Sequence, residues 1–372
     1  MAIRPQPLAA RIRAVNVLLH RWLGLTAGVL FVLLGLSGSL LVFGPELLAL
    51  QHRAVAGPPP EGWESNRAAV LARTLDEHPP GQVELVRFPR EPLGVYEIYL
   101  TDEVQEYRHA LSGEVLHERE GLGDLLMVAR EFHTHLLTGE TGELVLGWLG
   151  LVLVVLLVSG LWIWWPPKGA WGAALRYPVV RLPGPLLYWW HSTTGAVSFL
   201  LLGFLSLTGA AIVFYAVSQS LLTGLLGGQP PVLPTRVATH AEIEWPAVLQ
   251  RLDHTLPEGR TVFFYPPAEP GTPLVFRKQL PGELHPNGRS HVLLDARGEL
   301  AAAYDASAAG WGIRATDSIY PLHAGRVGAS WWQWVVAIAG VLPLPLFITG
   351  FILWRRARPP ARNRSASSRS PA

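Results

Sequence analysis

Four histidines of this 372-residue chain stand at repeated distances from pairs of small residues. His20 and His191 each precede a Ser/Thr-Gly pair by 17 residues, and His133 and His323 each precede one by 26. In that order, the pairs are Ser37-Gly38, Thr208-Gly209, Ser159-Gly160 and Thr349-Gly350. Imidazole is the commonest metal-ligating side chain. The spacing therefore predicts two equivalent pairs of histidines that bind a metal or a metal-containing cofactor.

The segments that carry or adjoin these histidines are long and apolar. The chain is 49% hydrophobic and only 16% charged, with a mean hydropathy of +0.26. The excess comes from four runs without a charged residue, at 22–45, 144–167, 186–217 and 329–354. Each run reaches the roughly 20 residues that a helix needs to cross a bilayer. The sequence thus predicts contact with a lipid bilayer and excludes a soluble enzyme or a disordered scaffold.

Charge is divided unevenly between the segments that flank these runs. The two terminal segments and the loop between the second and third runs contain 13 basic residues and no acidic residue. All 28 acidic residues lie in the other two segments, 46–143 and 218–328. Because positive charge accumulates on the cytoplasmic side, we expect a multi-pass protein of the bacterial inner membrane with both termini in the cytoplasm. The two long segments then face outward.

The two outer segments resemble each other. Each opens with a helix-like stretch, 66–78 or 242–254, and each continues with alternating, strand-like stretches. These stretches are 83–88, 95–101 and 106–110 in the first segment and 261–265, 273–278 and 290–294 in the second. The sequence therefore predicts two copies of one unit running in the same direction, with a pseudo-two-fold axis along the membrane normal.

We expect nine consecutive segments, mainly helical. They are a cytoplasmic N-terminus (1–13), transmembrane helix 1 (14–45), a first outer α+β module (46–130), a His-bearing segment with transmembrane helix 2 (131–167), a cytoplasmic loop (168–185), transmembrane helix 3 (186–217), a second outer α+β module (218–320), a His-bearing segment with transmembrane helix 4 (321–356) and a disordered basic tail (357–372).

The repeat pairs His20 with His191 and His133 with His323 across the central axis. An axial imidazole from each of two facing helices is what a six-coordinate haem iron requires. One haem for each pair gives two haems, one near each membrane face, an arrangement that passes electrons across the membrane. Because the chain has no cysteine, the haem is expected to be non-covalent haem b.

Two arginines support the haem prediction, and the other histidines are weaker ligand candidates. Arg21 and Arg326 stand next to or near ligand candidates and are expected to pair with haem propionates. A single histidine at a helix end is more often structural, and the Ser/Thr-Gly pairs are expected to serve helix packing. His135 is a weaker candidate than His133. The remaining histidines are expected at the surface, namely His52, His78, His109, His117, His240, His254, His285 and His291.

Motifs for other chemistries are absent. The sequence has no Gly-rich nucleotide-binding pattern. The basic residues flank the predicted helices rather than forming a nucleic-acid groove, so no nucleic acid is expected as a partner. Electrons must then come from quinol or from a separate reductase.

Several short motifs make the chain similar to the PepSY-associated transmembrane family, the iron-regulated inner-membrane proteins that include ferric-siderophore reductases. The likeness covers about residues 14–358. It rests on Leu19-His20-Arg21-Trp22-Leu23-Gly24-Leu25, Phe132-His133, Leu136-Leu137-Thr138-Gly139-Glu140-Thr141-Gly142, His191 with Thr194-Gly195, Leu322-His323-Ala324-Gly325-Arg326, and Thr349-Gly350-Phe351-Ile352-Leu353-Trp354-Arg355-Arg356.

The resemblance implies four transmembrane helices, two periplasmic PepSY-like modules and b-type haem ligands at His20, His133, His191 and His323. It also implies reduction of iron in a siderophore on the periplasmic side. Ser192 follows His191 here, where the family usually has an arginine.

The expected function is therefore that of a ferric-siderophore reductase-type oxidoreductase in iron uptake, which moves electrons across the membrane to a periplasmic acceptor. One alternative is a non-enzymatic membrane protein whose modules bind or regulate a periplasmic peptidase or peptide. A third is a transporter. The runs contain no charged residue to bind a charged substrate at mid-depth, which disfavours the transporter.

Overall fold

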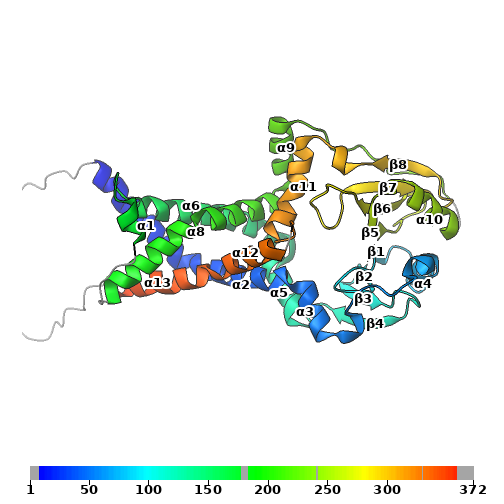
Figure 1. Cartoon of the computed structure of the whole chain (residues 1–372), viewed down its shortest axis with the longest axis horizontal. Coiled ribbons are helices and arrows are strands. Elements are labelled where there is room, and N and C mark those ends of the chain that lie inside the picture. The colour runs from blue at the N-terminus through cyan, green and yellow to red at the C-terminus, as the bar shows by residue number, and fades with distance from the viewer. Residues whose placement is uncertain (1–7, 177–182, 240–241, 329, 358–372) are drawn as a thin grey trace, which may run out of the picture. The chain divides into compact units, whose positions relative to one another are not determined.

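The computed structural model describes residues 8–176, 183–239, 242–328 and 330–357, and the chain forms two compact units. The first unit contains residues up to Gly35, Leu151–Ser206 and residues from Ala339 onward; the second contains Leu36–Gly150 and Leu207–Ile338. Most of the predicted basic tail lies outside the described residues, as do His240 and part of the loop at 168–185. The helices and strands are labelled in Figure 1.

Within the part of the chain that the structure describes, three helices are long and apolar enough to cross a membrane: Gly139–Trp164 (α6), Gly184–Val213 within α8, and Ser330–Arg356. The last of these consists of α12 (Ser330–Val341) and α13 (Pro343–Arg356). The prolines at its centre remove backbone donors there, which accounts for the break at Leu342. These helices identify the chain as a membrane protein.

A fourth span depends on a bent pair of helices. Helix α1 (Leu8–Thr26) and helix α2 (Gly28–Val42) meet at an angle of 54° and would together make one broken span. The sequence predicts a single helix over 14–45. The bend falls at Ala27, directly before Gly28, whose hydrogen in place of a side chain lets the Phe347 ring approach closely.

Shorter helices connect the spans to the rest of the chain. These shorter helices are α3 (Gly44–Gln51), α4 (Arg67–Asp76), α5 (Leu125–His135), α7 (Trp171–Leu175), α9 (Tyr215–Leu226), α10 (Trp245–His254) and α11 (Trp311–His323), with 3-10 turns at Arg53–Val55, Trp63–Asn66 and Ala306–Ala308. The span helix α8 extends over Pro183–Val213. Asp124 caps α5 by accepting hydrogen bonds from Leu126 and Met127. Leu136, in the left-handed conformation, ends α5, so His133 lies on a separate helix from α6.

Among the described residues, the strands of the second unit form one antiparallel sheet of eight strands. They are β1 (Val83–Arg87), β2 (Tyr96–Leu100), β3 (Val104–Arg108), β4 (Val115–Glu120), β5 (Arg260–Tyr265), β6 (Leu274–Gln279), β7 (Ser290–Leu294) and β8 (Leu300–Tyr304). Their order is β4-β3-β2-β1-β5-β6-β7-β8. The sequence predicts two α+β modules, and each supplies four strands. The modules join through β1 and β5, where Val86 pairs with Phe264.

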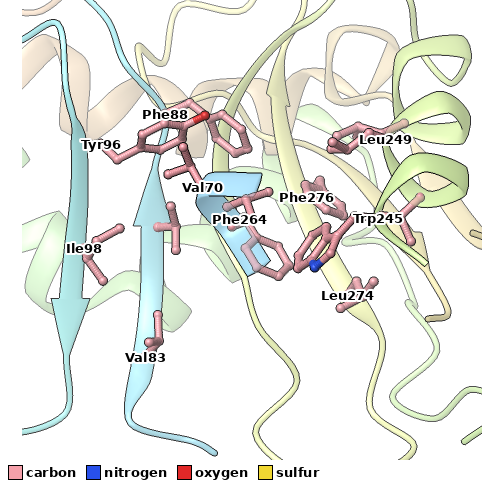
Figure 2. Close-up of a cluster of buried hydrophobic side chains, with 14 of the residues drawn as sticks. Val70, Val83, Phe88, Tyr96, Ile98, Trp245, Leu249, Phe264, Leu274 and Phe276 are labelled. Atoms are coloured by element: carbon pink, nitrogen blue, oxygen red, sulfur yellow. The ribbon is translucent and has the colours of Figure 1, made fainter. Parts of the chain in front are cut away.

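Helices α4 and α10 cover one face of this sheet. Trp245, Val248, Leu249 and Leu252 recur on one side of α10 and are all buried. Figure 2 shows Trp245 and Leu249 of α10 and Val70 of α4 gathered with Phe264 and Phe276 of the sheet. Because residues of both modules share this core, strands of both modules and the two helices contribute to a single hydrophobic cluster.

Candidate paired-histidine site

His20 of α1 is held against α6 through its Nδ1 atom. That nitrogen lies 3.1 Å from the backbone oxygen of Leu156 and 3.0 Å from Oγ of Ser159. A carbonyl oxygen only accepts, and the Ser159 hydroxyl donates its own hydrogen to Leu156 at 2.7 Å. Nδ1 therefore carries the proton, and the lone pair of the neutral ring is on Nε2.

His191 of α8 is held against α13 in the same way. Its Nδ1 lies 3.0 Å from the backbone oxygen of Leu346 and 3.0 Å from Oγ1 of Thr349. The Thr349 hydroxyl donates to Pro345 at 2.6 Å, so it accepts from the ring. His20 and His191 consequently share one tautomer and one kind of support.

The other two histidines contact the hydroxyl groups of the two remaining Ser/Thr-Gly pairs. Nδ1 of His133 on α5 lies 3.1 Å from Oγ of Ser37 on α2, and Nδ1 of His323 on α11 lies 3.1 Å from Oγ1 of Thr208 on α8. Each of the four histidines thus bonds the hydroxyl of a different Ser/Thr-Gly pair.

The glycine of each pair makes room for the imidazole. A Cβ atom on Gly160 would lie 2.8 Å from Cε1 of His20, and one on Gly38 would lie 2.7 Å from Cε1 of His133. The corresponding distances are 3.0 Å for Gly350 to His191 and 3.1 Å for Gly209 to His323. Helix packing, the role predicted for these pairs, accounts for the glycines but not for the hydroxyls.

The structure brings the four rings together as the two predicted pairs. The ring centroids of His20 and His191 lie 6.2 Å apart in the first unit, with an interplanar angle of 73°. Those of His133 and His323 also lie 6.2 Å apart in the second unit, with an angle of 40°. Among the described residues no group of three or more His, Cys, Asp or Glu is placed to hold a bare metal ion.

The two arginines predicted to meet propionates lie in different surroundings. Arg21 follows His20 and is exposed. Arg326 lies three residues after His323 and forms an ion pair with Glu46, with Nη1 3.4 Å from Oε1. The weaker candidate His135 pairs with Glu131 at 3.2 Å within α5.

The prediction that the other outer histidines lie at the surface is wrong for two of them. His285 is 4% exposed, and its Nδ1 accepts a hydrogen bond from the backbone of Asn287. The His78 side chain is 8% exposed and pairs with Glu106 at 3.2 Å. His78 follows α4 and His285 lies in the loop between β6 and β7. A single sequence has no periodic pattern there to indicate burial.

Comparison with known proteins supports the motif-based resemblance. No curated protein matches the chain. The sequence matches the PepSY-associated TM region over residues 17–357, which includes all four paired histidines. The apolar helices agree with this assignment. The chain therefore belongs to the PepSY-associated transmembrane family.

Proposed function

We propose that the chain is a haem-binding oxidoreductase that carries electrons across the membrane to an outer acceptor, a ferric siderophore. The observation that carries the proposal is the 6.2 Å separation of ring centroids in both histidine pairs. An imidazole nitrogen bonds a metal ion at about 2 Å and lies roughly 1 Å from its ring centroid, so two rings on opposite sides of one ion have centroids about 6 Å apart. The residues present fit two bis-histidine haems.

The Nδ1 hydrogen bonds support the same assignment. A metal-ligating histidine almost always donates its other ring N–H to a backbone carbonyl or another acceptor, which fixes the tautomer and makes the ligating nitrogen more basic. His20 and His191 do this toward Leu156 and Leu346. Nδ1 of His133 and of His323 contacts a hydroxyl at the equivalent positions, and a histidine that served only as a surface residue would not need such a partner.

Haem b, if held by His20 with His191 and by His133 with His323, would supply one-electron transfer. The protein orients the four imidazoles, and the apolar helices around them limit access of water. Reduction then releases iron from a ferric chelate, because Fe(II) is bound far more weakly by such chelators.

The proposal includes a topology. Both termini and the loop at 168–185 lie in the cytoplasm, the bent pair α1–α2 counts as one of four spans, and the sheet-bearing segments are periplasmic modules of a bacterial inner-membrane protein. Charge supports this orientation, since 13 basic residues and no acidic residue flank the spans on the inner side. The donor is quinol or a separate reductase.

The test is a reduced-minus-oxidised absorption spectrum with a haem-to-protein ratio, measured on the full chain in mild detergent after expression with ample haem. We expect two b-type haems. The double variants His20→Ala/His191→Ala and His133→Ala/His323→Ala should each retain one, and the control His135→Ala should retain two. A folded, colourless wild-type protein would overturn the proposal and favour a peptide- or peptidase-binding role.

A further inference from the structure

One row of side chains crosses the whole sheet on the face opposite α4 and α10. Each member is directly paired with its neighbour on the next strand, so all point to the same side. From β4 to β8 the row reads His117, Tyr107, Glu97, Arg87, Phe263, Arg277, His291 and Tyr304. The opposite face carries the apolar core shared with α4 and α10. Within the row, Tyr107, Glu97 and Phe263 are buried. Its accessible part is a polar surface around Arg87, Arg277 and His291, which are partly exposed.

The centre of the row is an aromatic ring between two cations. The guanidinium of Arg87 lies 4.7 Å from the Phe263 ring centroid, and that of Arg277 lies 5.9 Å from it. Nη1 of Arg277 also donates to the hydroxyl of Tyr265 at 3.1 Å. These contacts fix both guanidinium groups in place before any ligand arrives.

Positive charge on this surface exceeds negative charge. Arg87 pairs with Glu97 at 3.5 Å, and Arg289, next to the row, pairs with Asp317 of α11 at 3.3 Å. Arg90 and Arg277 have no ion pair among the described residues. Glu283 is engaged by the Arg289 backbone N–H and the Ser290 hydroxyl. The surface therefore contains four guanidinium groups and three carboxylates, which leaves one positive charge in excess.

Several buried polar atoms on this surface lack a hydrogen-bond partner within the described chain. They are Nε of Arg87, Arg90 and Arg277 and the hydroxyl of Tyr304. A buried donor without an acceptor costs about 1–3 kcal/mol, and more when it is charged. The remaining N–H groups of these guanidinium groups are suited to donate hydrogen bonds to carboxylate, catecholate or phosphate oxygens.

The pKa values of two nearby histidines reflect the positive charge of this surface. Burial, followed by the charges of Arg289 and Arg277, lowers the pKa of His285 to about 3. Burial and the same two arginines lower the pKa of His291 to about 4. Both rings are therefore neutral at physiological pH and remain available as hydrogen-bonding groups.

The helix that covers this surface also carries a proposed haem ligand. Asp317 of α11 contacts Arg289, and Tyr320 of α11 stacks on His285 with ring centroids 5.2 Å apart. His323 is the last residue of the same helix. A molecule bound against Arg277 and Arg289 would thus lie next to the helix that presents His323.

We infer that the partly exposed surface formed by Arg87, Arg277, Arg289 and His291, above the buried ring of Phe263, binds the electron acceptor, and that this acceptor is an anionic chelate with carboxylate or catecholate groups. The inference rests on the proposed function and specifies its substrate class. Neutral or cationic trihydroxamate chelates lack the charge that this surface complements.

Binding is tested with gallium(III) chelates, which occupy the site of a ferric chelate without being reduced. Calorimetric titration of the full chain in detergent should show binding of gallium(III)–citrate and a gallium(III) triscatecholate. Arg277→Gln and Arg289→Gln should each weaken binding about tenfold or more, because each removes a charge-assisted contact. Arg277→Lys keeps the charge and should weaken it less. The control Arg236→Gln removes an arginine whose side chain is 65% exposed and should leave binding within twofold.

Three results would overturn the inference: equal binding by the Arg277→Gln and Arg289→Gln variants, equal binding of a neutral gallium(III) trihydroxamate, or equally tight binding of inorganic phosphate alone. The haem content of the same samples separates this inference from the proposed function. If the chain contains two haems but does not bind the anionic chelates, only the inference of an acceptor surface is refuted. If a folded chain without haem binds them, the electron-transfer proposal is refuted instead.

Discussion

Thr349 accepts a hydrogen bond from Nδ1 of His191 at 3.0 Å while it donates its own hydrogen to Pro345. The hydroxyl thus fixes which ring nitrogen is protonated. This direction of hydrogen bonding leaves the Nε2 lone pair for a ligand, and Ser159 gives His20 the same support.

Replacing this hydroxyl should weaken cofactor binding without unfolding the chain. Thr349→Val keeps the size of the side chain and removes the acceptor. Loss of such a supporting hydrogen bond typically costs 10–100-fold in metal affinity. We expect haem to dissociate faster on transfer to apomyoglobin, followed by absorbance. Thr349→Ser should behave like the wild type, and an unchanged rate in Thr349→Val would contradict a supporting role.

The glycine of a Ser/Thr-Gly pair should be more sensitive than a glycine elsewhere on the same kind of helix. Gly160→Ala would place a Cβ atom 2.8 Å from His20 Cε1, so the ring must move. We expect the variant to bind one haem instead of two. Gly203→Ala on α8 meets no atom within 4 Å and should retain both. The readout is the haem-to-protein ratio.

Acid should destabilise the fold through His285. Its pKa is lowered to about 3 by burial and by Arg289 and Arg277. The unfolded chain therefore binds more protons between pH 6.5 and 3, and stability falls as pH falls through that window, by up to about 1.4 kcal/mol per pH unit. Thermal unfolding in detergent between pH 7.5 and 4.5 measures this loss. His285→Gln should reduce the slope, and the exposed His254→Gln should not.

The shared core should make the sheet sensitive to one aromatic side chain. Phe264 is fully buried and stacks on Phe276 with ring centroids 4.8 Å apart. Phe264→Ala should lower the free energy of unfolding by about 3–5 kcal/mol. Leu284→Ala, at a side chain that is 51% exposed, should change it by less than about 1 kcal/mol. Chemical denaturation of the full chain in detergent compares the two.

Local features of this fold follow from the sequence, and long-range ones do not. Alternating residues at 83–88 and 261–265 predict β1 and β5, and the apolar side of 242–254 predicts α10. The pairing of Val86 with Phe264 joins strands 178 residues apart, and no hairpin or spacing rule specifies that contact. The alternation of apolar and polar residues would be the same if each module formed a separate sheet.

The candidate site, too, was predictable from the sequence only in part. The repeated spacing of His20, His133, His191 and His323 predicts both pairs, and the structure brings each pair together. The role of Ser159 or Thr349 was not predictable, because a serine or threonine next to glycine is equally typical of close helix packing. The row through Arg87 and Arg277 depends on the β1–β5 pairing and is invisible without it.

The hydrogen bonds of the four histidines follow the two halves of the sequence rather than the two compact units. His20 and His133 are supported by Ser159 and Ser37, which belong to the same half of the sequence, and His191 and His323 are supported by residues of the other half. Each pair, in contrast, takes one ring from each half. Each pair of rings thus joins the two halves of the sequence, and any group bonded to both rings of a pair would stabilise the association of those halves.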